Sequence, residues 1–133
     1  DGKRLVSGGF DTVIKLWDVA TGEMRIFKGH SSIVFTVAFS PDGRYLSFIS
    51  DESGRPEIYV LEFPTPKSKW QVSTDGGRQP YWSVSGREIL YLSLNNEIAA
   101  RQAADAAVFR SNMFCRIRIS KRSASRFPSS WMK

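Results

Sequence analysis

An all-β fold is the prediction that this chain of 133 residues supports, and three observations lead to it. Short apolar runs, rich in β-branched and aromatic side chains, recur over residues 1–98 and are separated by turns of Gly, Pro, Asp and Ser. No stretch of this region has the 3.6-residue period of an amphipathic helix. Related segments also return at a regular spacing, which indicates that one small β unit is repeated.

The repeated unit is visible in three segments, "DGKRLVSGG" at 1–9, "DGRYLSFIS" at 42–50 and "SGREILYLS" at 85–93. Each places a basic residue and a short apolar run after a turn that contains glycine, and their starts are 41 and 43 residues apart. A four-stranded propeller blade has about 40 to 45 residues. The sequence therefore predicts a partial β-propeller of about two to two and a half four-stranded antiparallel blades, followed by an irregular C-terminal tail.

Alternation and turn chemistry predict the other strands in chain order. The segment 32–40 carries apolar side chains on both faces, with Phe35 on one face and Val34 on the other, and we expect it to be well buried. A turn with Pro at its second position and Gly at its fourth follows at 40–43. The remaining predicted strands are 12–19, 56–63, 69–73, 79–84 and 88–93.

The predicted organisation is an incomplete propeller over residues 1–102 and a basic, flexible tail over 103–133. Closed propellers have about four to eight blades, so the open edges need either remaining blades of a longer protein or copies of this chain. We expect the former, because the chain begins with Asp1 and its first blade starts in its second strand. The predicted blade boundaries are a fragment at 1–28, a blade at 29–73 and a fragment at 74–102.

The net charge of +6 belongs to the tail, because residues 1–102 hold twelve basic and twelve acidic side chains. The propeller body therefore gives no nucleic-acid signal. In the tail, aromatic residues lie near basic ones, which would suit single-stranded nucleic acid. The alternative is a non-homologous end, such as a frame change in the coding sequence. Within the tail, 115–120 predicts one edge strand with Ile117 and Ile119 on one face. The aromatic residues are Phe109, Phe114, Phe127 and Trp131.

Several classes of function find no support. No window of 18 apolar residues predicts a membrane span. Cys115 and His30, each the only residue of its kind, are too few for a zinc site, and we expect no metal or cofactor. Ser, His and Asp are present but no G-x-S-x-G turn is, so we expect no catalytic residue of that kind. The Gly pairs at 8–9 and 76–77 lack the spacing of a nucleotide loop.

The acidic pair Asp51 and Glu52 could work as acid and base or bind a cation. Their neighbours in "DESGRP", residues 51–56, are turn formers, and too few further acidic or amide side chains follow at calcium-loop spacing. We therefore expect both to be solvated residues at the corner of a hairpin.

The motif residues carry a family resemblance. With "GH" at Gly29 and His30, "WD" at Trp17 and Asp18, and Asp11 six residues before the tryptophan, roughly residues 1–46 resemble the WD-repeat β-propellers. Residues 42–98, which contain "YLSFISDESGRPEIYVLEF", resemble the TolB-like propeller repeats of bacterial proteins. The two resemblances together cover about residues 1–98.

The resemblance implies a buried hydrogen-bond network in each WD blade. Ser7, Asp11 and Trp17 would belong to the network of the first blade, and His30 to that of the next, where Tyr59 occupies the tryptophan position. His30 would then be structural, not catalytic. Loops on one rim of the propeller would face a partner. The residues expected on that rim are His30, Asp51, Glu52, Arg55 and Arg78.

The expected function is a non-catalytic scaffold that binds a protein or peptide, as part of a larger multidomain bacterial protein. An alternative is the propeller domain of an enzyme, such as a peptidase or kinase, whose catalytic domain lies outside this chain. The third is nucleic-acid binding by the tail. The compartment is left open between the cytoplasm and the bacterial periplasm, the latter if the TolB-like resemblance governs.

Overall fold

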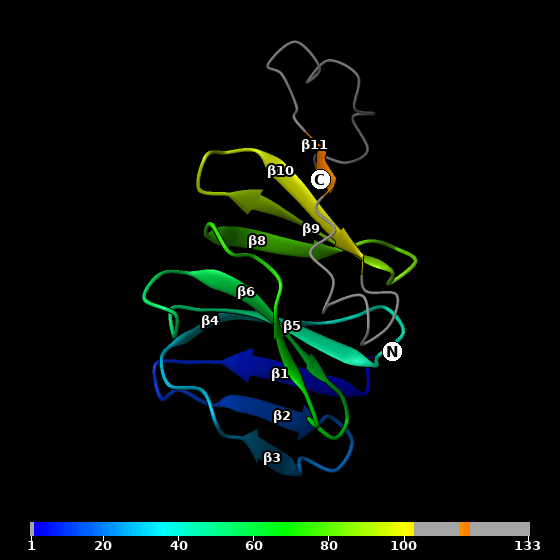
Figure 1. The fold of residues 1–133 in the computed structure, drawn as a ribbon. Coiled ribbons are helices and arrows are strands. Elements are labelled where there is room, and N and C mark those ends of the chain that lie inside the picture. Colours follow the sequence, from blue (N-terminus) through cyan, green and yellow to red (C-terminus); the bar gives the residue numbers. More distant parts are fainter. Residues whose placement is uncertain (1, 103–114, 118–133) are drawn as a thin grey trace.

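The computed structural model describes residues 2–102 and 115–117, and in these ranges it contains eleven strands and no helix. The strands form three antiparallel sheets that follow one another along the chain and stack in the same order (Figure 1). This arrangement confirms the predicted all-β partial propeller. The described ranges contain no helix long and apolar enough to cross a membrane.

The first sheet has three strands in the order β1-β2-β3, namely β1 (Arg4–Gly8), β2 (Ile14–Asp18) and β3 (Met24–Phe27). Its second hairpin closes on Asp18, whose Oδ1 accepts hydrogen bonds from the backbone N–H groups of Ala20 (2.9 Å) and Thr21 (3.0 Å). Such a side-chain cap stabilises a tight turn. Strand β3 is one that the sequence patterns did not reveal, because most of its side chains are exposed.

The second sheet contains β4 (Val34–Phe39), β5 (Tyr45–Ser50), β6 (Glu57–Glu62) and β7 (Lys69–Gln71), hydrogen-bonded in that order. The predicted turn at 40–43 is present, because the N–H of Gly43 donates to the carbonyl oxygen of Ser40 at 2.9 Å. Gly43 has a φ of 70°, which glycine adopts without a Cβ penalty. The sheet is a simple meander, so each strand pairs with its neighbour in the chain.

The third sheet contains β8 (Gly77–Trp82), β9 (Glu88–Ser93), β10 (Ile98–Gln102) and β11 (Cys115–Ile117). The edge strand predicted at 115–120 is confirmed for Cys115–Ile117, which pairs with β10, whereas 118–120 lie outside the described residues. Strand β10, which ends at Gln102, was not among the strands predicted from the sequence. The alanines at 99–100 hid this strand, since Ala has little β propensity.

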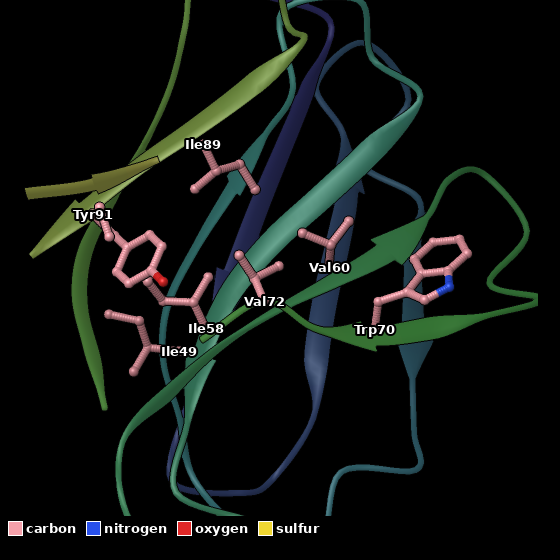
Figure 2. Packing of buried hydrophobic residues seen from close by; sticks show 8 residues of the cluster. Ile49, Ile58, Val60, Trp70, Val72, Ile89 and Tyr91 are labelled. Carbon is pink, nitrogen blue, oxygen red and sulfur yellow. The ribbon is translucent and has the colours of Figure 1, made fainter. Parts of the chain in front are cut away.

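The core has two layers, one on each face of the second sheet. Adjacent residues of β5 show the division, because Phe48 packs toward the first sheet and Ile49 toward the third. Both faces of β5 and β6 are buried for this reason, and apolar side chains occupy adjacent positions in both strands. Figure 2 shows the layer shared with the third sheet, which contains Ile49, Ile58, Val60, Trp70, Val72, Ile89 and Tyr91.

Strand β4 differs from expectation, because it is not well buried. Val34 is buried, but the next residue, Phe35, is 50% exposed. The register between β4 and β5 shifts between Val34 and Thr36, so Phe35 sits in a bulge. A bulge redirects side chains and breaks the strict alternation on which the prediction relied. Strand β4 is also the end strand of its sheet, which removes neighbours on one side.

Replacing Ile58 by Ala should lower the free energy of unfolding by about 2–5 kcal/mol, because this fully buried side chain fills the layer between the second and third sheets. Ile26→Ala removes the same atoms from an exposed strand position and should lower the free energy of unfolding by much less. Urea unfolding followed by tryptophan fluorescence measures both. Equal losses for the two variants would contradict the layered core.

Candidate interaction site

The loop between β5 and β6 is a hairpin corner whose backbone closes on itself. The N–H of Gly54 donates to the carbonyl oxygen of Asp51 at 2.8 Å, and Gly54 has a φ of 92°. The loop also meets the connection to the third sheet, because the N–H of Gly77 donates to the carbonyl oxygen of Pro56 at 3.0 Å. The segments 51–56 and 74–77 therefore lie side by side.

A buried carboxylate holds these segments together. Glu57, 1% exposed, accepts hydrogen bonds at Oε1 from the N–H of Gly76 (2.8 Å) and from Nε of Arg55 (2.9 Å). The Ser73 hydroxyl donates to Glu57 Oε2 and accepts from the N–H of Ile58 at 2.9 Å. A buried charge needs several such partners, and here each partner comes from an element beside the blade connection. We call this group the Glu57 clamp.

Sequence reasoning missed the Glu57 clamp. One signal was available, since Glu57 directly follows Pro56 and opens the apolar strand "EIYVLE". A carboxylate at that position is unexpected on a strand buried on both faces. Its partners, however, are 16 and 19 residues away at Ser73 and Gly76, a separation that local patterns do not reveal.

Arg55, expected on the partner-binding rim, is engaged within the chain. Besides Glu57, its guanidinium donates to the carbonyl oxygen of Thr74 and lies 3.9 Å from Oδ1 of Asp75. The side chain is about half exposed, so one edge of the guanidinium can still reach solvent. Contact of Arg55 with a partner stays a prediction.

The acidic pair at the start of the loop is split between two environments. Both carboxylate oxygens of Glu52 accept hydrogen bonds from Nζ of Lys69, at 2.7 Å and 2.9 Å, and the Glu52 side chain is buried. The prediction that both residues are solvated is therefore wrong for Glu52. The long Lys69 side chain reaches it across the sheet and passes over the Tyr59 ring, 5.6 Å from its centre. Asp51 has a buried Oδ1 without a hydrogen-bond partner in the described ranges.

His30 lies over the second sheet, away from the other three motif residues. It is 8% exposed, and its ring meets Phe48 edge-on at 4.7 Å between centres. Phe48 in turn stacks on Tyr59 at 5.4 Å. Burial, reinforced by the positive charge of Lys69 and opposed by Glu52, holds the pKa of His30 below its usual value. Neither ring nitrogen has a hydrogen-bond partner among the described residues.

The other motif residues lie on the first sheet. Asp11 accepts a hydrogen bond from Nζ of Lys15 at 2.5 Å, and this contact holds the pKa of Asp11 below its usual value. Ser7 in β1 pairs with Lys15 in β2, and Trp17 lies between Leu5 and Met24 of the neighbouring strands. The WD-type network among these residues stays a prediction.

A groove lies along β4 and β8, each of which is the first strand in the chain, and an end strand, of its sheet. We call these two the inner strands. The groove has a volume of about 500 Å³, and no acidic side chain lines it. Two aromatic side chains border it, Phe35 at 50% and Tyr81 at 66% exposure. A register shift between Arg78 and Tyr81 in β8 matches the one in β4, so both strands carry a bulge here. We call this feature the inner-strand groove; its lining residues are Phe35, Thr36, Ile49, Pro56, Arg78, Gln79, Pro80 and Tyr81.

Arg78, another residue expected on the rim, brings a positive charge to the inner-strand groove. Its guanidinium lies 3.4 Å from Oδ1 of Asn96, a long hydrogen bond that leaves most of its donors free to turn toward a ligand. Bulges commonly redirect side chains at binding sites. The described residues contain no group of three or more His, Cys, Asp or Glu side chains that could hold a metal. The site is therefore suited to binding an apolar group beside an anionic one.

The Glu57 clamp predicts a measurable cost for Glu57→Gln. The amide keeps the shape but loses the charge that three donors share, so we expect the free energy of unfolding to fall by about 1–3 kcal/mol. Chemical denaturation of Glu57→Gln and of the exposed control Glu23→Gln gives the comparison. A change within about 0.5 kcal/mol for both would argue against the clamp.

The lowered pKa of His30 predicts destabilisation in mild acid. The unfolded chain takes up the proton first, near pH 6.5, so stability is complete above that value and declines as the pH falls below it, by at most about 1.4 kcal/mol per pH unit. His30→Leu should flatten the profile of urea midpoints between pH 7.5 and 5.5. The lowered aspartate pKa values act in a separate window, below about 3.8. An unchanged slope in His30→Leu would reject the assignment.

The N-terminal part of the chain matches a known protein family. The family described as WD domain, G-beta repeat matches residues 1–18 and 22–54. A guanine nucleotide-binding protein subunit beta of Solanum tuberosum is 48% identical over 101 residues, which are 71% of this chain and 26% of that protein. The WD repeat-containing protein SL1-17 of Schistosoma mansoni is 38% identical over 52 residues, 39% of this chain and 17% of that protein. Human coronin-7 is 29% identical over 104 residues, 70% of this chain and 10% of that protein. The chain thus spans only a small part of these relatives.

A solved structure supports the second resemblance at the level of fold. The structure described as TolB from Agrobacterium tumefaciens superimposes with a TM-score of 0.67 at 20% identity, over 78% of this chain and 43% of that one. Both resemblances expected from the sequence are confirmed. Residues 1–18 and 22–54 match the WD-repeat family, and the chain has a partial β-propeller fold that it shares with the TolB structure.

Proposed function

We propose that this chain is a non-catalytic propeller scaffold whose inner-strand groove binds an extended peptide segment of a partner protein. The observation that carries the proposal is the pair of bulges in β4 and β8, which expose two aromatic side chains beside Arg78. Large, rigid aromatic side chains and arginine supply much of the binding energy at protein interfaces. The preferred segment has an apolar side chain next to a carboxylate.

The surrounding structure favours recognition without chemistry. The strands that border the groove are fixed by the sheets and by the Glu57 clamp, and a rigid frame reduces the entropy lost on binding. The relatives are named as a G-protein subunit, a coronin and a WD-repeat protein, and they support a scaffold in the general sense that the fold is used for interactions.

The proposal also concerns the larger protein to which these sheets would belong. We propose that the three sheets are part of a larger propeller, with blade boundaries at 1–28, 29–73 and 74–102, because the first sheet carries exposed apolar residues such as Leu5 and Met24. The alternative is that the propeller is attached to an enzyme domain that lies outside this chain.

We propose a bacterial source because the fold is shared with the Agrobacterium protein, whereas the relatives named above are eukaryotic. Nucleic-acid binding by 103–133 concerns residues that lie outside the described ranges, apart from Cys115–Ile117.

A displayed peptide library, selected on the purified chain, tests the groove. We expect enriched peptides to share an apolar residue next to Asp or Glu. Synthetic copies should bind Phe35→Ser and Tyr81→Ser at least about tenfold more weakly than the wild type, as measured by fluorescence polarisation.

Phe10→Ser is the matched control, because Phe10 is an exposed aromatic residue that does not line the inner-strand groove. Affinities reduced equally by Phe10→Ser would point to unspecific hydrophobic contact. A selection that yields no common sequence, with the fold intact by circular dichroism, would overturn the proposal.

A further inference from the structure

A second cavity lies on the other side of the second sheet, away from the inner-strand groove. It has a volume of about 210 Å³ and lies between the end of β3 with residues 28–30 that follow it, and strands β6 and β7 with the loop that joins them. Its lining shares no residue with the groove. The lining residues are Phe27, Lys28, Gly29, His30, Leu61, Pro66, Lys67, Ser68 and Lys69.

Basic side chains, and no acidic ones, line this cavity. Three of them are lysines, Lys28, Lys67 and Lys69. Lys69 donates two of its hydrogen bonds to Glu52, which partly offsets its charge. Lys28 and Lys67 have no ion-pair partner among the described residues, and both are exposed enough to turn toward the cavity. An anion in the cavity would attract these lysine ammonium groups electrostatically.

His30 closes the inner side of the cavity and has unmet hydrogen-bonding capacity. It is more than nine-tenths buried, and neither Nδ1 nor Nε2 has a partner in the described ranges. A neutral imidazole offers one donor and one acceptor, and leaving such a buried group unpaired is unfavourable. Gly29, with a φ of 105°, sets the backbone turn that brings Lys28 and His30 to the same space.

We propose that this cavity is a binding site for a phosphate group, either free or carried on a serine or threonine of a partner segment. A phosphate monoester carries about −1.5 to −2 charges at neutral pH and three acceptor oxygens. These match three lysines of which one is already paired with Glu52. A single carboxylate would leave part of the positive charge unbalanced. The site is independent of the peptide groove, and neither proposal needs the other.

Charges on every neighbouring element act on His30. Lys69 lowers its pKa and Glu52 raises it, Phe48 and Tyr59 are the uncharged rings behind it, and Lys28 and Lys67 border the same cavity. Glu62 lines a separate depression that also touches Lys67. A bound phosphate adds negative charge close to the imidazole, so it raises the pKa of His30.

The chain has one histidine, so its imidazole signals in a nuclear magnetic resonance spectrum report on this cavity alone. Titration with inorganic phosphate should shift these signals saturably and raise the pKa of His30. Chloride at equal ionic strength should not. The double variant Lys28→Gln, Lys67→Gln should weaken phosphate binding by at least about tenfold, because it removes charge-assisted donors. Lys3→Gln removes one positive charge outside the cavity lining and should leave the affinity unchanged.

The source of the phosphate is resolved with a peptide that contains phosphoserine and with its unmodified serine and glutamate forms. Tighter binding of the phosphopeptide than of inorganic phosphate assigns the site to a phosphorylated partner, and equal binding assigns it to free phosphate. Absence of a saturable His30 shift, or equal weakening by Lys3→Gln and the double variant in folded proteins, would overturn the proposal. Peptide binding in the inner-strand groove, measured with Phe35→Ser, would be unaffected by that outcome.

Discussion

Burial of both faces of the second sheet is the constraint on which the rest of the structure depends. Alternate side chains of β5 and β6 pack against the first sheet and the third, so neither neighbour can be removed without exposing a row of apolar residues. Phe48 and Ile49 show how completely the two layers are separated by one sheet. Because apolar burial is the dominant favourable term in folding, the stacking of the sheets follows from these two strands.

Polar contacts then decide how the sheets are joined. The Glu57 clamp ties the start of β6 to the connection that leads into β8, through partners at Arg55, Ser73 and Gly76. On the other side, the guanidinium of Arg4 in β1 lies over the ring of Phe63, 4.9 Å from its centre. One contact is a buried charge with fixed donors and the other a cation above an aromatic face. Together they connect each outer sheet to the central one.

The two candidate sites arise from departures from regular blade geometry. Bulges at equivalent places in β4 and β8 open the inner-strand groove. The His30 ring meets Phe48 edge-on, and Phe48 in turn stacks on Tyr59. The imidazole is therefore buried without polar partners in the described ranges, beside a cavity lined by lysines.

Local sequence patterns were sufficient to predict the repeat and most of the strands, but not β3 and β10. The run at 88–93 predicts β9 to the residue, and Pro and Gly at 40–43 predict the turn that follows β4, because alternation and turn propensity are properties of neighbouring residues. Only the tertiary structure decided that Phe35 is exposed, that Glu52 is buried against Lys69, and that Glu57 joins two sheets. These features depend on a bulge and on partners 16 to 19 residues away, and such long-range packing leaves no periodic trace in the sequence.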